Sequence, residues 1–251
     1  MDLGLKGKVI LVTGAGQGIG LALGRFLAQE GASVAFHYHT SRAGAEEAAR
    51  EAERLGSPAM AIAADLRRPT AITQMVAAVE EQLGAVYALV NNAAFTKVHP
   101  FLETQEDDLR EEFDATVFGT MMLTRAVLER MVPRGRGSVV TVVGEAGRVG
   151  ESRLAVTAAA RAAEVAFAKS IAKEFGRHGI RSNVVSLGLI EKPDKPMHVD
   201  PSRVDQIRRL YPMGRLGRVE DVPPLVALLC SELTDWVTGQ VWAINGGYTM
   251  V

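Results

Sequence analysis

The sequence predicts an α/β domain built on a doubly wound parallel sheet of about seven strands, with helices on both faces. Short β-rich runs alternate with longer helical patterns along the whole chain, which is typical of strands joined by crossover helices. A glycine-rich loop stands between the first predicted strand and the first predicted helix. The length of 251 residues and the 47% hydrophobic content suit a single domain, 1–251, and no repeat or linker divides the chain.

The first half of the chain supplies four predicted strands, each a short apolar run, at 9–12, 34–36, 59–64 and 88–90. Between them the spacing of apolar residues predicts helices over 18–30, 44–55 and 69–83. Ile19, Leu23 and Phe26 mark the inner stripe of the first helix, and Pro69 suits the first turn of the third. A long helix over 105–131 follows and ends before Pro133.

The second half continues the alternation with strands at 138–143 and 180–186 and a long helix over 154–175. The segment 189–212 has no strand pattern and carries Pro193, Pro196 and Pro201, which suits a surface segment that orders over a ligand. A helix over 219–230 and a strand at 241–244 complete the predicted sheet.

The composition excludes several classes of protein. A net charge of -1 argues against nucleic-acid binding, which needs a basic face. No run of about 18 apolar residues predicts a membrane span. The first residues lead directly into a strand without the apolar core of a signal peptide, and Cys230 is the single cysteine. We therefore expect a cytoplasmic protein without disulfides, in which Cys230 is a buried core residue.

The loop Thr13-Gly14-Ala15-Gly16-Gln17-Gly18-Ile19-Gly20 follows a strand and opens a helix. Glycines in this position let the backbone turn and approach a pyrophosphate, and the helix N-terminus offers free N–H groups and the positive end of its dipole. The spacing of Gly14, Gly18 and Gly20 in this context predicts a dinucleotide-binding site.

Further short motifs follow the later strands. They are Asp65-Leu66, Asn91-Asn92-Ala93-Ala94, Asn183 with Gly188, Gly239-Gln240 and Asn245-Gly246-Gly247. With the glycine loop, they make the whole chain resemble the short-chain dehydrogenase/reductase family, and in particular its 3-oxoacyl-acyl-carrier-protein reductase type. The resemblance implies a Rossmann-like fold, with 189–212 as the substrate lid.

The resemblance also implies the cofactor contacts. Asp65 would reach the adenine, Asn91 would brace the central strands and line the ribose, and the backbone of Ile190 would bracket the nicotinamide carboxamide. Leu187 and Ala94 depart from the Pro and Gly usual in the family. The expected cofactor-binding residues are Gly14, Gln17, Gly18, Ile19, Gly20, Thr40, Ser41, Arg42, Asp65, Leu66, Asn91, Ala93, Arg161, Gly188 and Ile190.

Cofactor preference is set after the second strand, where NAD-selective relatives carry an Asp for the ribose hydroxyls. This chain has His37-Tyr38-His39-Thr40-Ser41-Arg42, with two hydroxyls and a guanidinium but no carboxylate. Such groups suit a 2′-phosphate, so we expect NADP(H) to be favoured over NAD(H). His37 and His39 share a strand face, but no cysteine or carboxylate completes a metal site, and we expect no bound metal.

The four catalytic positions of the family carry other residues here. Alignment of the surrounding motifs places Thr116, Gly144, Thr157 and Arg161 where the family has Asn, Ser, Tyr and Lys. In the family the Tyr is the general acid, the Lys lowers its pKa and holds the ribose, the Ser polarises the carbonyl and the Asn positions a water. Thr157 and Arg161 keep the i, i+4 spacing that places two side chains on one helix face.

The replacements change the chemistry. An aliphatic hydroxyl such as that of Thr157 is far too weak an acid to replace a phenol. Arg161 can hold a ribose but cannot shuttle a proton at neutral pH. Glu145, directly after the lost Ser position, is the first candidate for a replacement acid; the alternative is that it is a solvated loop charge. Other candidates in or near that loop are Arg148, Glu151, Ser152 and Arg153.

Three functions remain open from the sequence. The first is an atypical NADP(H)-dependent reductase of a small-molecule substrate such as a ketone. The second is a catalytically inactive subunit that supports a homologous active partner through the helices 105–131 and 154–175, which form the dimer face in relatives. The third is redox-neutral isomerisation or dehydration that uses Glu145 or Arg161. A homotetramer, a homodimer and a hetero-oligomer with an active homologue are all compatible with the chain.

Overall fold

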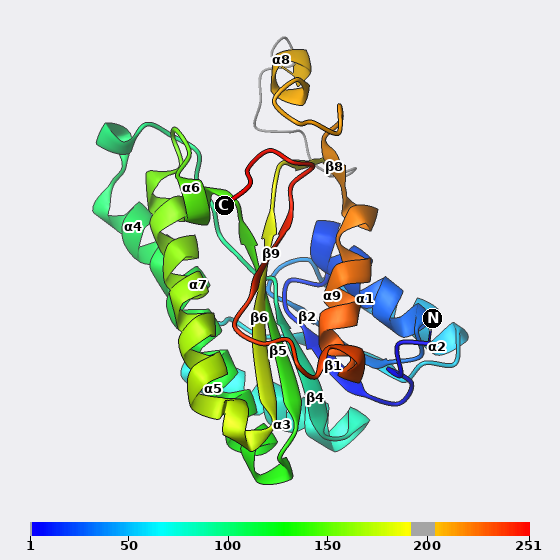
Figure 1. Ribbon diagram of the computed structural model, residues 1–251. Coiled ribbons are helices and arrows are strands. Elements are labelled where there is room, and N and C mark those ends of the chain that lie inside the picture. Colours follow the sequence, from blue (N-terminus) through cyan, green and yellow to red (C-terminus); the bar gives the residue numbers. More distant parts are fainter. Residues whose placement is uncertain (1, 192–203) are drawn as a thin grey trace.

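The centre of the protein is a seven-stranded parallel sheet with the strand order β3-β2-β1-β4-β5-β6-β9 (Figure 1). The computed structural model describes residues 2–191 and 204–251. The strands are β1 (Val9–Val12), β2 (Ser33–Tyr38), β3 (Ala59–Ala63), β4 (Val86–Asn91), β5 (Gly137–Gly144), β6 (Ile180–Leu187) and β9 (Val241–Ile244). This topology confirms the predicted doubly wound α/β fold.

Helices cover both faces of the sheet, which is why its central strands are buried along almost their whole length. One face packs against α1 (Gly18–Gln29), α2 (Arg42–Arg54) and α9 (Pro223–Cys230). The other face packs against α3 (Pro69–Leu83), α5 (Gly119–Met131) and α7 (Ala155–Phe175). Cys230 is fully buried in the first of these two cores, as predicted.

The helix predicted over 105–131 is not uniform. It consists of α4 (Glu106–Glu112), a π-helical segment over Phe113–Phe118, and α5. The π segment contains Thr116, whose hydroxyl accepts a hydrogen bond from the backbone N–H of Phe95 at 3.3 Å. The spacing of apolar residues does not reveal a single π-helical turn, although such turns are frequent at functional sites.

Some short elements were not predicted. The helix α6 (Ala146–Val149) follows β5, and the two-residue strands β7 (Ile190–Glu191) and β8 (Gly217–Arg218) pair with each other. Elements of this length are too short to show a periodic pattern. Of the predicted lid 189–212, residues 192–203 lie outside the described part of the chain, and α8 (Val204–Arg208) follows them.

The predicted helix 219–230 begins as a 3-10 turn, Val219–Asp221, and becomes α-helical only at Pro223. A proline at the first helical position has no N–H to lose and is suited to start a helix. Within the described residues, no helix is both long and apolar enough to cross a membrane.

Candidate functional site

The glycine loop packs directly against the turn that follows β2. A Cβ atom on Gly16 would lie 2.2 Å from the carbonyl oxygen of Ser41, and one on Gly20 would lie 2.2 Å from the carbonyl oxygen of Gly14. Any larger residue at either position would collide with backbone, so the sequence needs glycine there. The close approach places Ser41, which stands between Thr40 and Arg42 in the chain, directly beside the loop.

The N-terminus of α1 is open to an anion. Gln17 precedes the helix in an extended conformation, its side chain makes no capping hydrogen bond, and the first turn contains no acidic residue. The first N–H groups of a helix lack intrahelical partners and attract negative charge. The predicted pyrophosphate site therefore fits this end of the helix.

His37 connects the glycine loop to two strands. The backbone N–H of Gly14 donates to its Nδ1 at 3.2 Å, and its Nε2 lies 3.1 Å from the carbonyl oxygen of Ala64. Both contacts are made by the neutral tautomer that carries its hydrogen on Nε2. Burial lowers the pKa of His37 to about 4. Over residues 2–191 and 204–251 no cluster of metal-ligating side chains is found, and His37 has a packing role.

This burial predicts a pH-dependent stability. The unfolded chain binds a proton at His37 near its ordinary pKa of 6.5, whereas the folded chain binds it only near about 4. Acid therefore favours unfolding, and the free energy of unfolding should fall by as much as about 3 kcal/mol as the pH drops from 6.5 to 4. Urea unfolding across this window measures the slope. His37→Asn, which does not titrate, should remove much of it, and an equal slope in both proteins would contradict the assignment.

The residues predicted to bind the 2′-phosphate lie at the protein surface. Arg42 is the first residue of α2, its side chain is 73% exposed, and its Nε donates to Glu46 at 2.6 Å. Thr40 and Ser41 precede it at the same helix end, and the first turn of α2 contains no acidic residue. An anion at this position would meet the helix N-terminus and the guanidinium together.

The residues predicted around the adenosine have partners of their own. Asp65 accepts two side-chain hydrogen bonds from Arg67, at 2.9 Å each, and these hold the pKa of its carboxyl down at about 2. Asn91 donates to the Thr124 hydroxyl on α5 at 3.1 Å. Bracing of β1 against β4 is done by Asn92, whose side-chain amide donates to the carbonyl oxygen of Thr13 at 2.9 Å.

The predicted nicotinamide end lies at the carboxyl edge of β6. Gly188 and Ile190 line one pocket together with Tyr211 and Asn245. The Tyr211 hydroxyl accepts from the backbone N–H of Leu189 at 2.9 Å and so fixes the loop that follows β6.

A buried polar cluster lies between α7 and the α4–α5 helix. Thr157 and Arg161 are 6% and 7% exposed, and Arg161 Nη1 donates to Glu164 Oε2 at 2.7 Å. The other oxygen of Glu164 accepts from the Thr120 hydroxyl on α5 at 3.0 Å. Glu112, at the end of α4, is 2% exposed and lies close enough to Arg161 for the cation to act on its ionisation.

The two carboxylates of this cluster, Glu112 and Glu164, were not identified as site residues from the sequence. Glu164 stands three residues after Arg161 and seven after Thr157, so helical geometry places all three on one face. Glu112 stands four residues before Thr116. These spacings could have indicated from the sequence that both glutamates lie near the site.

Gly144 has open space where its side chain would be, since a Cβ there would meet nothing within 4 Å. Gly147, by contrast, lets α6 lie directly on α7. A Cβ on Gly147 would come within 2.4 Å of the Arg161 Cβ, and this contact explains why Arg161 is covered.

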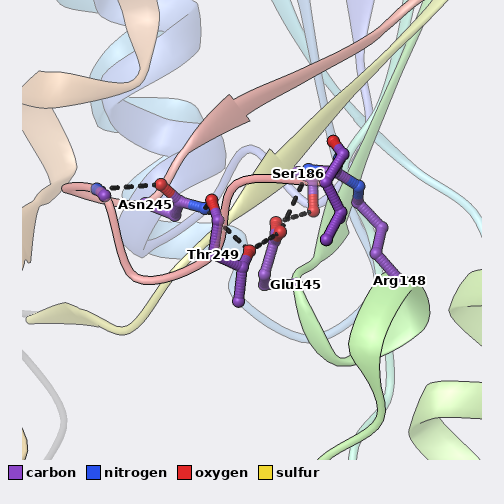
Figure 2. Close-up of polar contacts among 7 residues, drawn as sticks. Glu145, Arg148, Ser186, Asn245 and Thr249 are labelled. Carbon is purple, nitrogen blue, oxygen red and sulfur yellow. Dashed lines mark hydrogen bonds and ion pairs between the residues drawn. The ribbon is translucent and has the colours of Figure 1, made fainter. Parts of the chain in front are cut away.

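Glu145 holds the C-terminal residues in place. Its Oε2 accepts from the Ser186 hydroxyl at 2.5 Å, and its Oε1 accepts from Arg148 at 3.0 Å and from the Thr249 hydroxyl (Figure 2). Asn245 binds Thr249 in turn, at 2.8 Å to its carbonyl oxygen. Glu145 is 4% exposed and is not a solvated loop charge. All three contacts use its carboxylate as an acceptor, which favours a structural clasp over a proton donor.

The other residues of the predicted loop are exposed or near the surface. Arg148 binds both Glu145 and the backbone carbonyl of Val251, and Glu151 accepts from the Tyr248 hydroxyl at 2.9 Å. Ser152 and Arg153 are exposed. Arg153 has φ +66°, which no other non-glycine residue of the described chain shares in sign, and its carbonyl oxygen accepts from the N–H of His99.

Comparison with known proteins identifies the family. The family model described as enoyl-(acyl carrier protein) reductase matches residues 14–249. The protein is a member of the short-chain dehydrogenase/reductase family.

Relatives within this family are similar over almost their whole length. A 3-oxoacyl-[acyl-carrier-protein] reductase of Vibrio cholerae is 32% identical over 249 residues, which cover 99% of this chain and 100% of that protein. An L-rhamnose 1-dehydrogenase (NAD(P)(+)) of a Sphingomonas species is 33% identical over 245 residues, covering 97% and 96%. A solved structure from Sinorhizobium meliloti, assigned to the short-chain alcohol dehydrogenases, superposes with a TM-score of 0.93 at 27% identity, covering 99% and 98%.

Membership of the short-chain dehydrogenase/reductase family agrees with the open α1 N-terminus, since proteins of this family use nicotinamide cofactors. The residues present fit such a group at the glycine loop and at the turn that holds Arg42.

Proposed function

We propose that the protein is an NADP(H)-dependent oxidoreductase that reduces a carbonyl group and uses a proton donor other than tyrosine. The observation that carries this proposal is the open N-terminus of α1, packed against a turn that offers two hydroxyls and Arg42. Glycine at positions 16 and 20 is required by backbone contacts inside the protein, so the support comes from the free helix end and from the residues of the adjacent turn.

The chain's own residues divide the work of binding. The glycine loop and Gly18-Ile19-Gly20 would hold the pyrophosphate, and Thr40, Ser41 and Arg42 the 2′-phosphate. The flanks of the adenosine would be formed by Asp65, Leu66, Asn91 and Ala93, and the nicotinamide half by Arg161, Gly188 and Ile190. The bound dinucleotide would supply the hydride.

The substrate class follows from the relatives by analogy. Among them are 3-oxoacyl-[acyl-carrier-protein] reductases and an L-rhamnose 1-dehydrogenase (NAD(P)(+)). A Cβ on Gly144 would meet nothing within 4 Å, so space is open at that position. We therefore expect a ketone, with a β-keto ester or thioester as the first class to test.

Arg42→Ala should weaken NADPH binding by about tenfold or more, because a charge-assisted contact to phosphate contributes roughly 1.5–3 kcal/mol. NADH, which lacks the 2′-phosphate, should be affected little. Calorimetric titration of both nucleotides measures the difference. Arg50→Ala, an exposed arginine further along α2, is the matched control. An equal loss of NADPH and NADH affinity would remove Arg42 from the phosphate site.

Transfer of deuterium tests the reaction itself. NADPH deuterated at the reactive carbon is incubated with the protein and a panel of ketones and β-keto esters, and the products are analysed by mass spectrometry. Deuterium at the carbinol carbon supports the proposal. If oxidised cofactor accumulates without deuterium in any product, hydride transfer to a carbonyl is contradicted.

A second candidate is a non-catalytic subunit. Its support is an exposed alanine stripe on α7, at Ala155, Ala159, Ala162 and Ala166, with Phe118 of the neighbouring π segment 57% exposed. Such a face suits close contact with another helical pair, in a homodimer, a homotetramer or a complex with an active homologue. Turnover by the purified chain alone would rule this candidate out.

A further inference from the structure

The loop that follows β6 is held by three hydrogen bonds from different parts of the chain. The backbone N–H of Gly188 donates to the carbonyl oxygen of Ile244 on β9 at 3.0 Å, and the N–H of Gly217 donates to the carbonyl oxygen of Leu189 at 3.0 Å. The third bond uses a side chain, since the N–H of Leu189 donates to the Tyr211 hydroxyl at 2.9 Å. The Leu189 peptide N–H is therefore tied to a phenol that comes 22 residues later in the chain.

The same loop borders a cavity of about 190 Å³. Gly188, Leu189 and Ile190 line this cavity together with Tyr211 and Met213. Atoms that border an empty space lack packing partners on that side, so close packing alone does not fix a loop there. Its hydrogen bonds therefore decide where the loop stands, and the one to Tyr211 is the one made by a side chain.

Tyr211 is itself fixed in place. It is only 6% exposed, and its ring stacks on that of Tyr248, with the ring centroids 5.0 Å apart and the planes inclined by 19°. The Tyr248 hydroxyl in turn donates to Glu151 at 2.9 Å. On the side of the loop, a Cβ on Gly188 would lie 3.1 Å from the edge of the Tyr211 ring. Burial also raises the pKa of Tyr211, so its hydroxyl is a neutral acceptor held at one position.

The loop lies where the second half of a dinucleotide is expected. In a doubly wound sheet a dinucleotide lies across the carboxyl ends of the strands, with one half on each side of the point where the strand order reverses. The strand order is β3-β2-β1-β4-β5-β6-β9, the glycine loop follows β1, and the turn that holds Arg42 follows β2. With the 2′-phosphate at Arg42, the adenosine half belongs to the β2 side and the nicotinamide half to the side of β4, β5 and β6.

We propose that Tyr211 is a positioning residue for the nicotinamide half of the cofactor, because its hydroxyl holds residues 188–190 in the conformation that receives this half. The inference rests on the proposed NADP(H)-dependent function. Without the hydrogen bond to Leu189, the loop has to be ordered when the cofactor binds, and this ordering lowers the apparent affinity. The pyrophosphate and the 2′-phosphate are expected at the ends of β1 and β2, so their binding should not depend on Tyr211.

The first test compares Tyr211→Phe with wild type by calorimetric titration with two ligands. This substitution removes the hydroxyl and keeps the ring that stacks on Tyr248. NADPH affinity should fall about 3- to 10-fold, which is what one neutral hydrogen bond contributes. The second ligand is 2′-phospho-ADP-ribose, which has the adenosine, the 2′-phosphate and the pyrophosphate but no nicotinamide. It should bind wild type and Tyr211→Phe with equal affinity.

The matched control is Tyr87→Phe, which removes the hydroxyl of a half-buried tyrosine near the amino end of β4, at the opposite edge of the sheet. It should change the affinity for neither ligand. Equal NADPH affinity in wild type and Tyr211→Phe would overturn the proposal. A loss by the same factor for NADPH and for 2′-phospho-ADP-ribose would also overturn it, because a general structural effect does not distinguish the two ends of the cofactor.

A second readout needs no nucleotide. Hydrogen exchange of the Leu189 amide in the free protein should be faster in Tyr211→Phe than in wild type, because the amide has lost its acceptor, while exchange in β1 and β4 stays unchanged. An equal exchange rate of Leu189 in both proteins would overturn the role of the hydroxyl in holding the loop. Failure of wild type to bind NADPH would instead contradict the proposed function and with it the role toward the nicotinamide, whereas the exchange result tests the hold on the loop alone.

Discussion

Replacing Arg161 with methionine is expected to lower the free energy of unfolding by about 3–5 kcal/mol at neutral pH, because it removes one partner of a buried ion pair. Arg161 and Glu164 are both nearly inaccessible and are joined at 2.7 Å. Without the guanidinium, Glu164 keeps only the Thr120 hydroxyl, and two buried carboxyl groups remain without a cation. The penalty should shrink at acidic pH, where both can be protonated.

Urea unfolding measures this effect, and the double variant Arg161→Met with Glu164→Gln is its matched control. The double variant should recover most of the lost stability, since it leaves no unpaired charge at Glu164. A single variant that loses less than about 1 kcal/mol would mean that the pair contributes no more than a surface ion pair. Loss of NADPH affinity in the stable double variant would support a ribose contact by Arg161 as well.

Replacing Glu145 with glutamine is expected to cost roughly 2–3 kcal/mol of stability and to loosen the C-terminal residues. The amide nitrogen cannot accept a hydrogen bond, so either Ser186 or the pair of Arg148 and Thr249 loses its acceptor. Hydrogen exchange at residues 245–251 should rise while the rest of the sheet stays protected.

The same substitution distinguishes a clasp from a catalytic acid. Thr249→Val leaves the carboxylate in place but removes its contact with the C-terminal segment. If Glu145 acts as a clasp, both variants should lower turnover by similar factors. If Glu145→Gln abolishes turnover and Thr249→Val leaves it intact, Glu145 is the acid, as first predicted.

Much of the fold was predictable because its elements are long or follow fixed motifs. The strand β1, the helix α3 and the strand β9 begin and end at the predicted residues. The short elements α6, β7 and β8 were missed because two to four residues cannot show a period. The π segment around Thr116 was missed because a wide turn shifts the helix face by one residue without changing the composition.

The candidate site was predictable where backbone geometry sets the residue type. Glycine at positions 16 and 20 is required by close backbone contacts, and the sequence motif marks the same loop. Side-chain partners were harder to foresee, because they depend on pairs far apart in the sequence. His37 with Gly14, Glu145 with Thr249, and Glu112 with Thr157 are contacts of this kind, formed only when the strands and helices pack.

Titration of the purified protein with NADPH and with NADH tests the central claim most directly, with binding followed by heat or by nucleotide fluorescence. The account predicts micromolar affinity for NADPH and clearly weaker binding of NADH, because the open end of α1 and Arg42 are both in place. Absence of binding by either nucleotide would contradict it and would leave the glycine loop as a structural element of the fold alone.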